Sequence, residues 1–64
     1  MTNYGIAYLE RLARNWQNAY RTVNGKEPPD VVWERGWFLI GGKKYRRSVL
    51  EAMHTRLQKR VNAQ

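Results

Sequence analysis

Apolar side chains recur at helical spacing between residues 4 and 23. The repeat places on one face of a helix Leu9, Leu12, Ala13, Trp16, Ala19, Tyr20 and Val23, and polar side chains fill the opposite face. Thr2 or Asn3 can cap the start of this helix. Asn24 and Gly25 form a suitable end, because both residue types tolerate the left-handed conformation. The pattern predicts one long amphipathic helix.

A proline-containing linker, residues 26–29, follows the first helix. Pro29 can open a short helix over residues 30–35 that ends at Gly36, because the missing N–H of proline costs nothing in a first turn. The β-branched and aromatic side chains of residues 31–33 favour an extended strand instead. The helical turn is the preferred interpretation here, and the strand is the alternative.

The clearest local signal is a β-hairpin over residues 37–46. Gly41 and Gly42 supply the positive φ angles that a two-residue hairpin turn requires. In this register Ile40 faces Lys43 and Phe38 faces Tyr45. Three side chains then share a core face, namely Phe38, Ile40 and Tyr45. The opposite face is half apolar and half basic, with Trp37, Leu39, Lys44 and Arg46.

A second amphipathic helix is predicted after Arg47. Ser48 and Glu51 have the spacing of a capping box. The apolar stripe of this helix consists of Leu50, Met53, Leu57 and Val61. The expected fold is therefore an α+β, winged-helix-like mini-domain: a long N-terminal helix, a possible short helix, a two-stranded hairpin or wing, and a C-terminal helix. The hairpin must pack on the helices, because an isolated hairpin is marginal in water.

Length and composition restrict the chain to one small basic domain over residues 1–64. The chain has no Cys and a single His, so neither a disulfide framework nor a Cys/His zinc site is expected. The formal net charge is +7. The first half, residues 1–32, contributes +1 and residues 33–64 contribute +6, as counted from the charged residues of each half. An excess of positive charge confined to one half favours a polyanionic partner.

The C-terminal half resembles a known family of small DNA-binding proteins. The residues that carry the likeness are Ile40-Gly41-Gly42, Tyr45-Arg46-Arg47-Ser48 and Leu50-Glu51-Ala52. They resemble the wing and following helix of phage excisionases and related MerR-type winged helix-turn-helix proteins. The resemblance implies binding of duplex DNA, with the wing against the backbone or minor groove. It also implies a role in site-specific DNA recombination or phage gene control.

The candidate nucleic-acid-binding residues are cations near the wing. Lys43, Lys44, Arg46 and Arg47 fall within five positions and suit contact with phosphates. Their alternative role is to prevent pairing at an exposed strand edge. Arg35 is the only cation of the expected short helix.

Lys59 and Arg60 are expected to add to the same footprint, or to complement the dipole at the end of the last helix. Arg11, Arg14 and Arg21 line the polar face of the first helix, where a solvated surface is the simpler interpretation.

No residue set for catalysis is recognisable, and no enzyme activity, cofactor or metal is expected. No run is apolar enough to span a membrane and no signal peptide is evident, so a cytoplasmic location is expected, in the host cell if the chain is phage-encoded.

Other partners stay open beside duplex DNA. The first is RNA. The second is a host protein, bound by a small phage-type inhibitor through Trp33, Arg35 and Trp37. The third is a homodimer through the first helix, where Tyr4, Tyr8 and Leu9 widen the apolar face.

Overall fold

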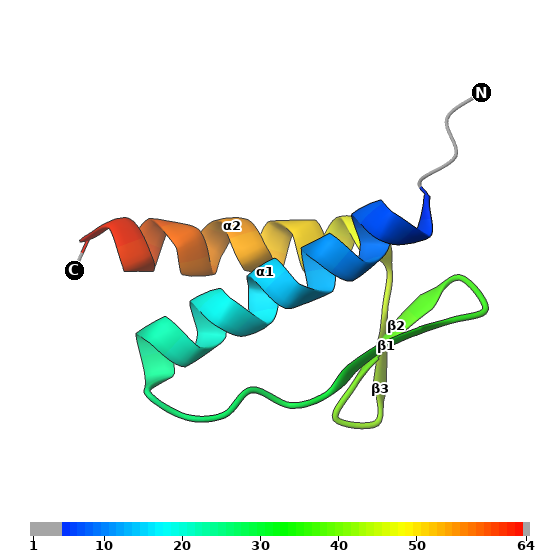
Figure 1. The fold of residues 1–64 in the computed structure, drawn as a ribbon, viewed down its shortest axis with the longest axis horizontal. Coiled ribbons are helices and arrows are strands. Elements are labelled where there is room, and N and C mark those ends of the chain that lie inside the picture. Colours follow the sequence, from blue (N-terminus) through cyan, green and yellow to red (C-terminus); the bar gives the residue numbers. More distant parts are fainter. Residues whose placement is uncertain (1–4, 64) are drawn as a thin grey trace.

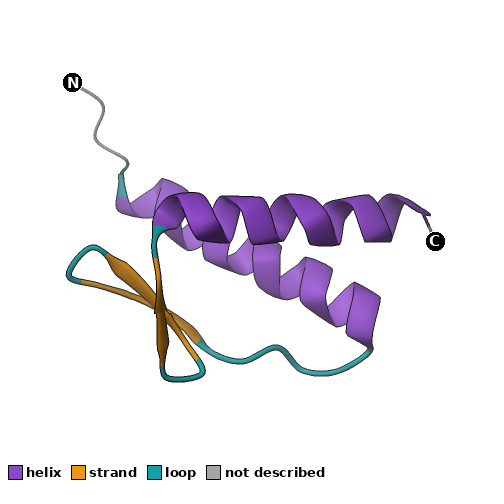
Figure 2. Ribbon diagram, turned by 180° about the vertical axis from the view of Figure 1, so that it is seen from behind, coloured by secondary structure: helices purple, strands orange, loops and turns teal. Residues whose placement is uncertain are grey.

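The computed structural model describes residues 5–63 of the chain. The elements are helix α1 (Ile6–Asn24), strands β1 (Val31–Glu34), β2 (Trp37–Ile40) and β3 (Lys43–Tyr45), and helix α2 (Arg47–Ala63). The three strands form one antiparallel sheet in the order β1-β2-β3. The two helices run side by side in the same direction, and the sheet lies against their N-terminal halves (Figure 1). The view from behind shows the same two layers (Figure 2). The predicted α+β class is confirmed.

Helix α1 follows the predicted amphipathic pattern and ends where the sequence predicts. Gly25 adopts the left-handed conformation, with φ 66°, and donates its N–H to the carbonyl of Arg21. The first residue of the helix is Ile6, preceded by an extended Gly5 that makes no side-chain cap. The predicted caps Thr2 and Asn3 lie outside the described residues. The long N-terminal helix is therefore confirmed, with a start two residues later than expected.

The segment predicted as a short helix is strand β1 instead. Val31 pairs with Ile40 and Glu34 pairs with Trp37, so residues 30–35 contain no helical turn. The favoured interpretation was wrong, and the extended alternative holds. Pro29 is compatible with the first position of a helix, but it does not stabilise the turns that would follow. By contrast, the β-branched and aromatic side chains of β1 favour an extended strand that pairs with β2. The wing is consequently three-stranded rather than two-stranded.

The hairpin of β2 and β3 has the predicted register. Ile40 pairs with Lys43 and Phe38 pairs with Tyr45. Gly41 and Gly42 both have positive φ, 57° and 84°, as the two-residue turn requires.

Helix α2 starts at Arg47 without the predicted capping box. The carbonyl of Arg46 accepts the first hydrogen bonds of the helix, from the N–H groups of Val49 and Leu50. Ser48 is therefore already inside the first turn. The carboxylate of Glu51 accepts side-chain hydrogen bonds from Tyr8 and Arg47. The helix begins two residues too early for the Ser48–Glu51 box, because a single residue, Arg46, connects β3 to α2.

The core lies between the inner face of the sheet and the two helices. Phe38 from β2 and Leu50 from α2 are fully buried, each with 0% exposure. They meet an apolar stripe of α1 that consists of Leu9, Leu12 and Trp16. The remaining predicted stripe of α2 packs at the margin of this core, through Met53 and Leu57. Because so few side chains are fully buried, each of them carries a large share of the stability.

We expect Leu50→Ala to lower the free energy of unfolding by about 2–5 kcal/mol, because it removes the α2 side chain that meets the sheet and leaves a cavity. Val49→Ala is the matched control: Val49 is its neighbour but is 43% exposed, and a change within about 0.5 kcal/mol is expected. Urea denaturation of both variants measures the difference. Equal losses would show that α2 does not pack on the sheet through Leu50.

Candidate nucleic-acid interface

The sheet presents a second face, turned away from the helices, which we call the outer face. The strand register aligns Val32, Leu39 and Lys44 across it, and Glu34 beside Trp37. Phe38 and Ile40 are buried on the inner face, whereas Trp37 and Leu39 are only partly covered. The outer face is therefore a mixed surface with an aromatic centre and a basic margin.

Arg46 lies over the ring of Trp37 on this face. Its guanidinium carbon is 3.7 Å from the ring centroid, and the Lys44 ammonium is 5.8 Å from the same centroid. Stacking on an aromatic ring uses the flat face of a guanidinium and leaves its N–H edges available to an anion. Trp37 therefore restrains Arg46, so that less side-chain entropy is lost when an anion binds.

The backbone also fixes Arg46, because strand β3 and helix α2 are directly connected. Tyr45 ends the strand and packs against the core, and Arg47 is the first residue of the helix. The carbonyl of Arg46 accepts two hydrogen bonds from the first turn. Lys44 thus projects from strand β3, and Arg46 projects from the single connecting residue whose carbonyl is held by the first turn of α2.

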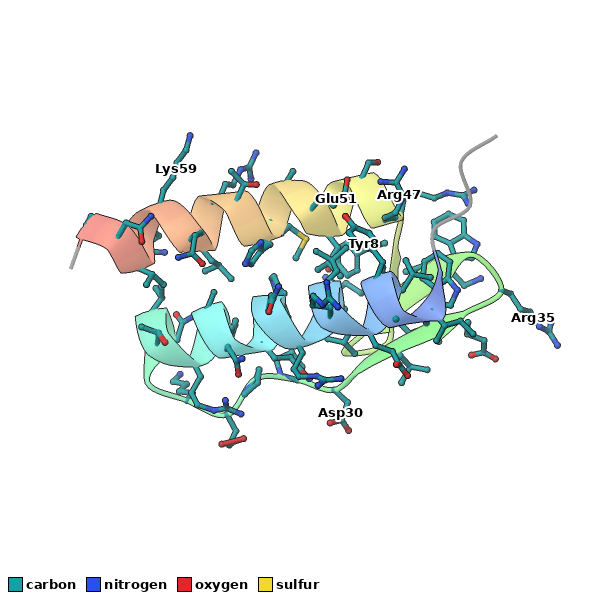
Figure 3. The ribbon with its side chains drawn as sticks, turned by 45° about the horizontal axis from the view of Figure 1, so that its top comes forward. Tyr8, Asp30, Arg35, Arg47, Glu51 and Lys59 are labelled. Carbon is teal, nitrogen blue, oxygen red and sulfur yellow. The ribbon has the colours of Figure 1, made fainter. Side chains whose placement is uncertain are left out.

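Arg47 has a different environment from its basic neighbours. It donates a hydrogen bond of 2.8 Å to Glu51, one turn along α2, and both side chains are about one-third exposed. The hydroxyl of Tyr8 in α1 donates to the same carboxylate oxygen, and the three side chains meet between the two helices (Figure 3). The hydrogen bond from Tyr8, with the contributions of Arg47, holds the pKa of Glu51 below its ordinary value of 4.5.

The four cations predicted as one finger therefore divide into three environments. Lys44 and Arg46 lie on the outer face. Lys43 pairs with Ile40 next to the turn and is exposed on the helix side of the sheet. Arg47 is engaged by Glu51. Within residues 5–63, the ion pairs are those of Arg21 with Glu27 and of Arg47 with Glu51, so Lys43, Lys44 and Arg46 have no acidic partner there.

Arg35 occupies the tip of the first hairpin, between β1 and β2. It is exposed, and its side chain extends away from the body of the fold (Figure 3). Its φ is 51°, and that of Gly36 is 83°. A left-handed conformation costs an ordinary L-residue about 1–2 kcal/mol, and Asn or Gly normally occupies this turn position. Arg35 also lines a shallow depression with Trp37 and Lys44, so it belongs to the margin of the outer face.

Lys59 and Arg60 lie apart from this cluster. Lys59 lies twelve positions after Arg47 in α2, a rise of about 18 Å at about 1.5 Å per residue. Lys59 extends into solvent near the far end of α2 (Figure 3). Arg60 borders a groove beside Tyr20 and Leu57. The structure thus places the predicted footprint in two regions rather than in one.

The two tryptophans that flank Arg35 face opposite sides of the sheet. Trp33 lies against Phe38 in an edge-to-face contact, with centroids 4.7 Å apart, whereas Trp37 supports Arg46 on the outer face. The structure therefore does not bring the two rings together on one face. The apolar residues predicted to widen the dimer face of α1 are used within the chain, since Leu9 is buried and Tyr8 bonds to Glu51. Tyr4 lies outside the described residues.

Two contacts of this region were absent from the sequence predictions. The predicted register already placed Trp37 and Arg46 on one face, so their stacking could have been anticipated from the hairpin alone. The contact of Tyr8 with Glu51 joins residues 43 positions apart, and no local pattern indicates it.

Comparisons of the chain with protein-family models, with curated proteins and with solved structures find no match. Over the part of the chain that the structure describes, neither helix combines the length and apolar character needed to cross a membrane.

The lowered pKa of Glu51 predicts a specific pH dependence of stability. Its ionised form stabilises the fold above pH 4.5, and this contribution is lost as the pH falls through the lower folded-state pKa. We expect Glu51→Gln to cost about 1 kcal/mol near neutral pH, the scale of one partly exposed hydrogen bond. The difference from the natural chain should shrink in acid.

Thermal unfolding of both proteins from pH 7 to pH 2.5 tests this expectation. Tyr8→Phe, which removes only the hydroxyl, should reduce the same part of the stability that is lost in acid. A stability difference that is independent of pH would contradict the proposed network.

Proposed function

We propose that this chain binds duplex nucleic acid, with DNA favoured, through the outer face of the sheet. The observation that carries the proposal is the arrangement of Lys44 and Arg46, two exposed cations without an acidic partner in residues 5–63, around the ring of Trp37. Phosphate contacts by such cations release condensed counterions, which supplies affinity without sequence preference.

The covered state of Trp37 favours phosphates over single-stranded bases as the ligand. A base can stack only on an open aromatic face, and the Arg46 guanidinium lies 3.7 Å from the centroid of this ring. Opening that face would cost the cation–π contact. The stacked guanidinium instead offers a rigid hydrogen-bonding edge, which suits a phosphate oxygen.

The proposed footprint has a centre and two outer parts. Lys44 and Arg46 form the centre. Lys43 lies beside the turn between β2 and β3, and Arg35 lies in the turn between β1 and β2. Arg47 borders the centre at the start of α2. Lys59 and Arg60 are too distant to bind the same phosphates, and in this proposal they contact a separate stretch of the duplex.

The role that best fits this footprint is that of a non-catalytic accessory protein, similar to excisionases. Its binding would rely mainly on contacts with the phosphate backbone of the DNA. Its action would be to assist recombination or phage gene control in the cytoplasm. The likeness of residues 40–52 to the wing and helix of that family supports this part of the proposal.

We expect the double variant Lys44→Glu/Arg46→Glu to weaken duplex binding by at least about tenfold at low salt. The slope of log affinity against log salt should also fall by about two, because about 0.9 is lost per phosphate contact. A gel-shift series with a random duplex, from low to moderate salt, measures both quantities. The loss should be equal for unrelated sequences.

The matched control is a charge reversal away from the sheet. Lys26→Glu changes the charge of an exposed residue in the linker after α1 and should leave most of the affinity intact. Competition between duplex DNA and duplex RNA of the same sequence decides the nucleic-acid class. Natural-chain affinity that does not change with salt would contradict the proposal.

Arg35→Asn separates turn stability from binding. Asn is favoured at this left-handed turn position, so the variant should gain about 1 kcal/mol in the free energy of unfolding. It should also bind duplex more weakly, with a salt slope reduced by about one. Denaturation and gel shift on the same preparation measure both effects. Tighter or unchanged duplex binding would exclude Arg35 from the footprint.

A further inference from the structure

The two edges of the sheet differ in a way that the proposed nucleic-acid function does not use. Strand β3 carries Lys43 and Lys44 at its edge, and cations at an edge discourage pairing with another strand. Strand β1 forms the opposite edge, and it presents Val31, Val32 and Trp33. No other strand in residues 5–63 pairs with its outer side. The edge of β1 is therefore open and apolar.

The backbone groups available on this edge follow from the register. In a two-residue hairpin the residues that flank the turn form a hydrogen-bonded pair, here Glu34 with Trp37. Because such pairs alternate along an antiparallel ladder, Val32 also bonds toward β2. The N–H and C=O groups of Val31 and Trp33 consequently point outward, where an additional strand would meet them.

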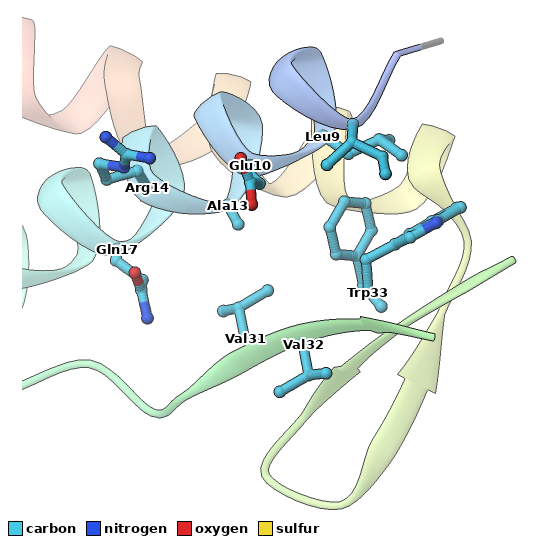
Figure 4. A pocket seen from close by; sticks show the side chains of 10 residues that line it. Leu9, Glu10, Ala13, Arg14, Gln17, Val31, Val32 and Trp33 are labelled. Carbon is cyan, nitrogen blue, oxygen red and sulfur yellow. The ribbon is translucent and has the colours of Figure 1, made fainter. Parts of the chain in front are cut away.

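A groove of about 430 Å³ lies between this edge and helix α1, with a mainly apolar lining to which α1 adds Glu10, Arg14 and Gln17. Figure 4 shows Val31 and Trp33 directed toward the helix and Val32 directed away from it. Ile6, Val32 and Trp33 line the groove and are 70%, 51% and 37% exposed. Three of the most exposed apolar side chains of the described residues therefore gather at the open edge.

Acidic side chains stand at both ends of β1. Asp30 and Glu34 share the outer face with Val32, because side chains alternate along an extended strand. Both are exposed, and neither has an ion-pair partner within residues 5–63. Asp30 points away from the body of the fold (Figure 3). In a chain of net charge +7, these are two carboxylates at the ends of one strand, although Arg35 and Lys44 line a depression with Glu34, and Arg14 lines the groove.

We propose that the β1 edge binds an extended, basic-apolar segment of a partner protein by strand addition. In such a complex, the residues opposite Val31 and Trp33 bond to the backbone and direct their side chains toward the groove. The residue opposite Val32 lies on the outer face between the residues opposite Asp30 and Glu34. The preferred ligand is therefore five residues long, with cations at its first and fifth positions and apolar residues between them.

Charge disfavours a second copy of this chain as the occupant. Symmetric antiparallel pairing of two β1 strands, in the register that matches their outward groups, sets Val31 opposite Trp33. The same register places Asp30 opposite Glu34 of the other copy, on one face. Like charges directly opposite each other destabilise a sheet, whereas a basic segment relieves both acidic side chains.

Two peptides test the proposal directly. The probe is Lys-Val-Ile-Val-Lys and its control is Glu-Val-Ile-Val-Glu, each flanked by Gly-Ser. Titration into ¹⁵N-labelled chain should shift the amides of Val31 and Trp33 and slow their hydrogen exchange. We expect the basic peptide to bind about fivefold more tightly than the acidic one, from two cross-strand charge pairs.

Charge exchange in the protein should reverse this preference. Asp30→Lys/Glu34→Lys should bind the acidic peptide more tightly than the basic one. Glu27→Lys, a similar reversal in the linker before β1, should keep the natural preference. Because Glu34 lies beside Trp37 on the outer face, the Asp30→Lys/Glu34→Lys variant should bind duplex at least as tightly as the natural chain, while its peptide preference reverses. Failure of this proposal and failure of the nucleic-acid proposal are therefore distinguishable.

Three results would overturn the proposal. The first is equal affinity for the two peptides in the natural chain. The second is amide shifts confined to the β3 edge. The third is concentration-dependent self-association in sedimentation experiments with protection at Val31 and Trp33, which would make a second copy the occupant.

Discussion

The fold depends on the burial of the inner face of the sheet against two helices that run in the same direction. Strands of three or four residues cannot hold a sheet together in water. Phe38 on the central strand and Leu50 on α2 supply the fully buried contact, and α1 closes it with Leu9, Leu12 and Trp16. This small core holds the sheet in place, and with it the side chains of the outer face and of the two edge strands.

The same arrangement separates two kinds of surface. Packing one face of the sheet on the helices leaves the other face and both edges exposed. The β3 side carries Lys44 and Arg46 ordered around Trp37, whereas the β1 side carries apolar residues between Asp30 and Glu34. The two proposed sites thus meet on the outer face, where Glu34 lies beside Trp37, and each is centred on a different edge strand of the sheet.

The two proposals together give this chain two attachments. In this scheme, the basic face holds the nucleic acid and the open edge holds a protein. Arg35 lies at the end of β1 and beside the outer face, so it is close to both surfaces. Its left-handed backbone is consistent with a side chain retained for binding at some cost in stability.

Local patterns predicted most of the secondary structure. The apolar repeat of α1, the Gly41-Gly42 turn with its register, and the stripe of α2 are each encoded within a few neighbouring residues. The exception is β1, where the helix-start signal of Pro29 competed with the β preference of Val31 and Val32. Pairing with β2 decided between them, and that pairing is a tertiary contact.

The candidate site was predicted only in part, because sequence proximity does not fix the direction of a side chain. The sequence by itself determined the helices, the hairpin and the excess of basic residues in the second half, since these follow from local spacing and charge. Only the tertiary structure decided that Arg47 and Tyr8 bond to the same carboxylate of Glu51. The tertiary structure also placed Lys59 far from the cations near the sheet. These outcomes depend on which face each strand buries and on how the two helices align, and such constraints act between residues distant in the chain.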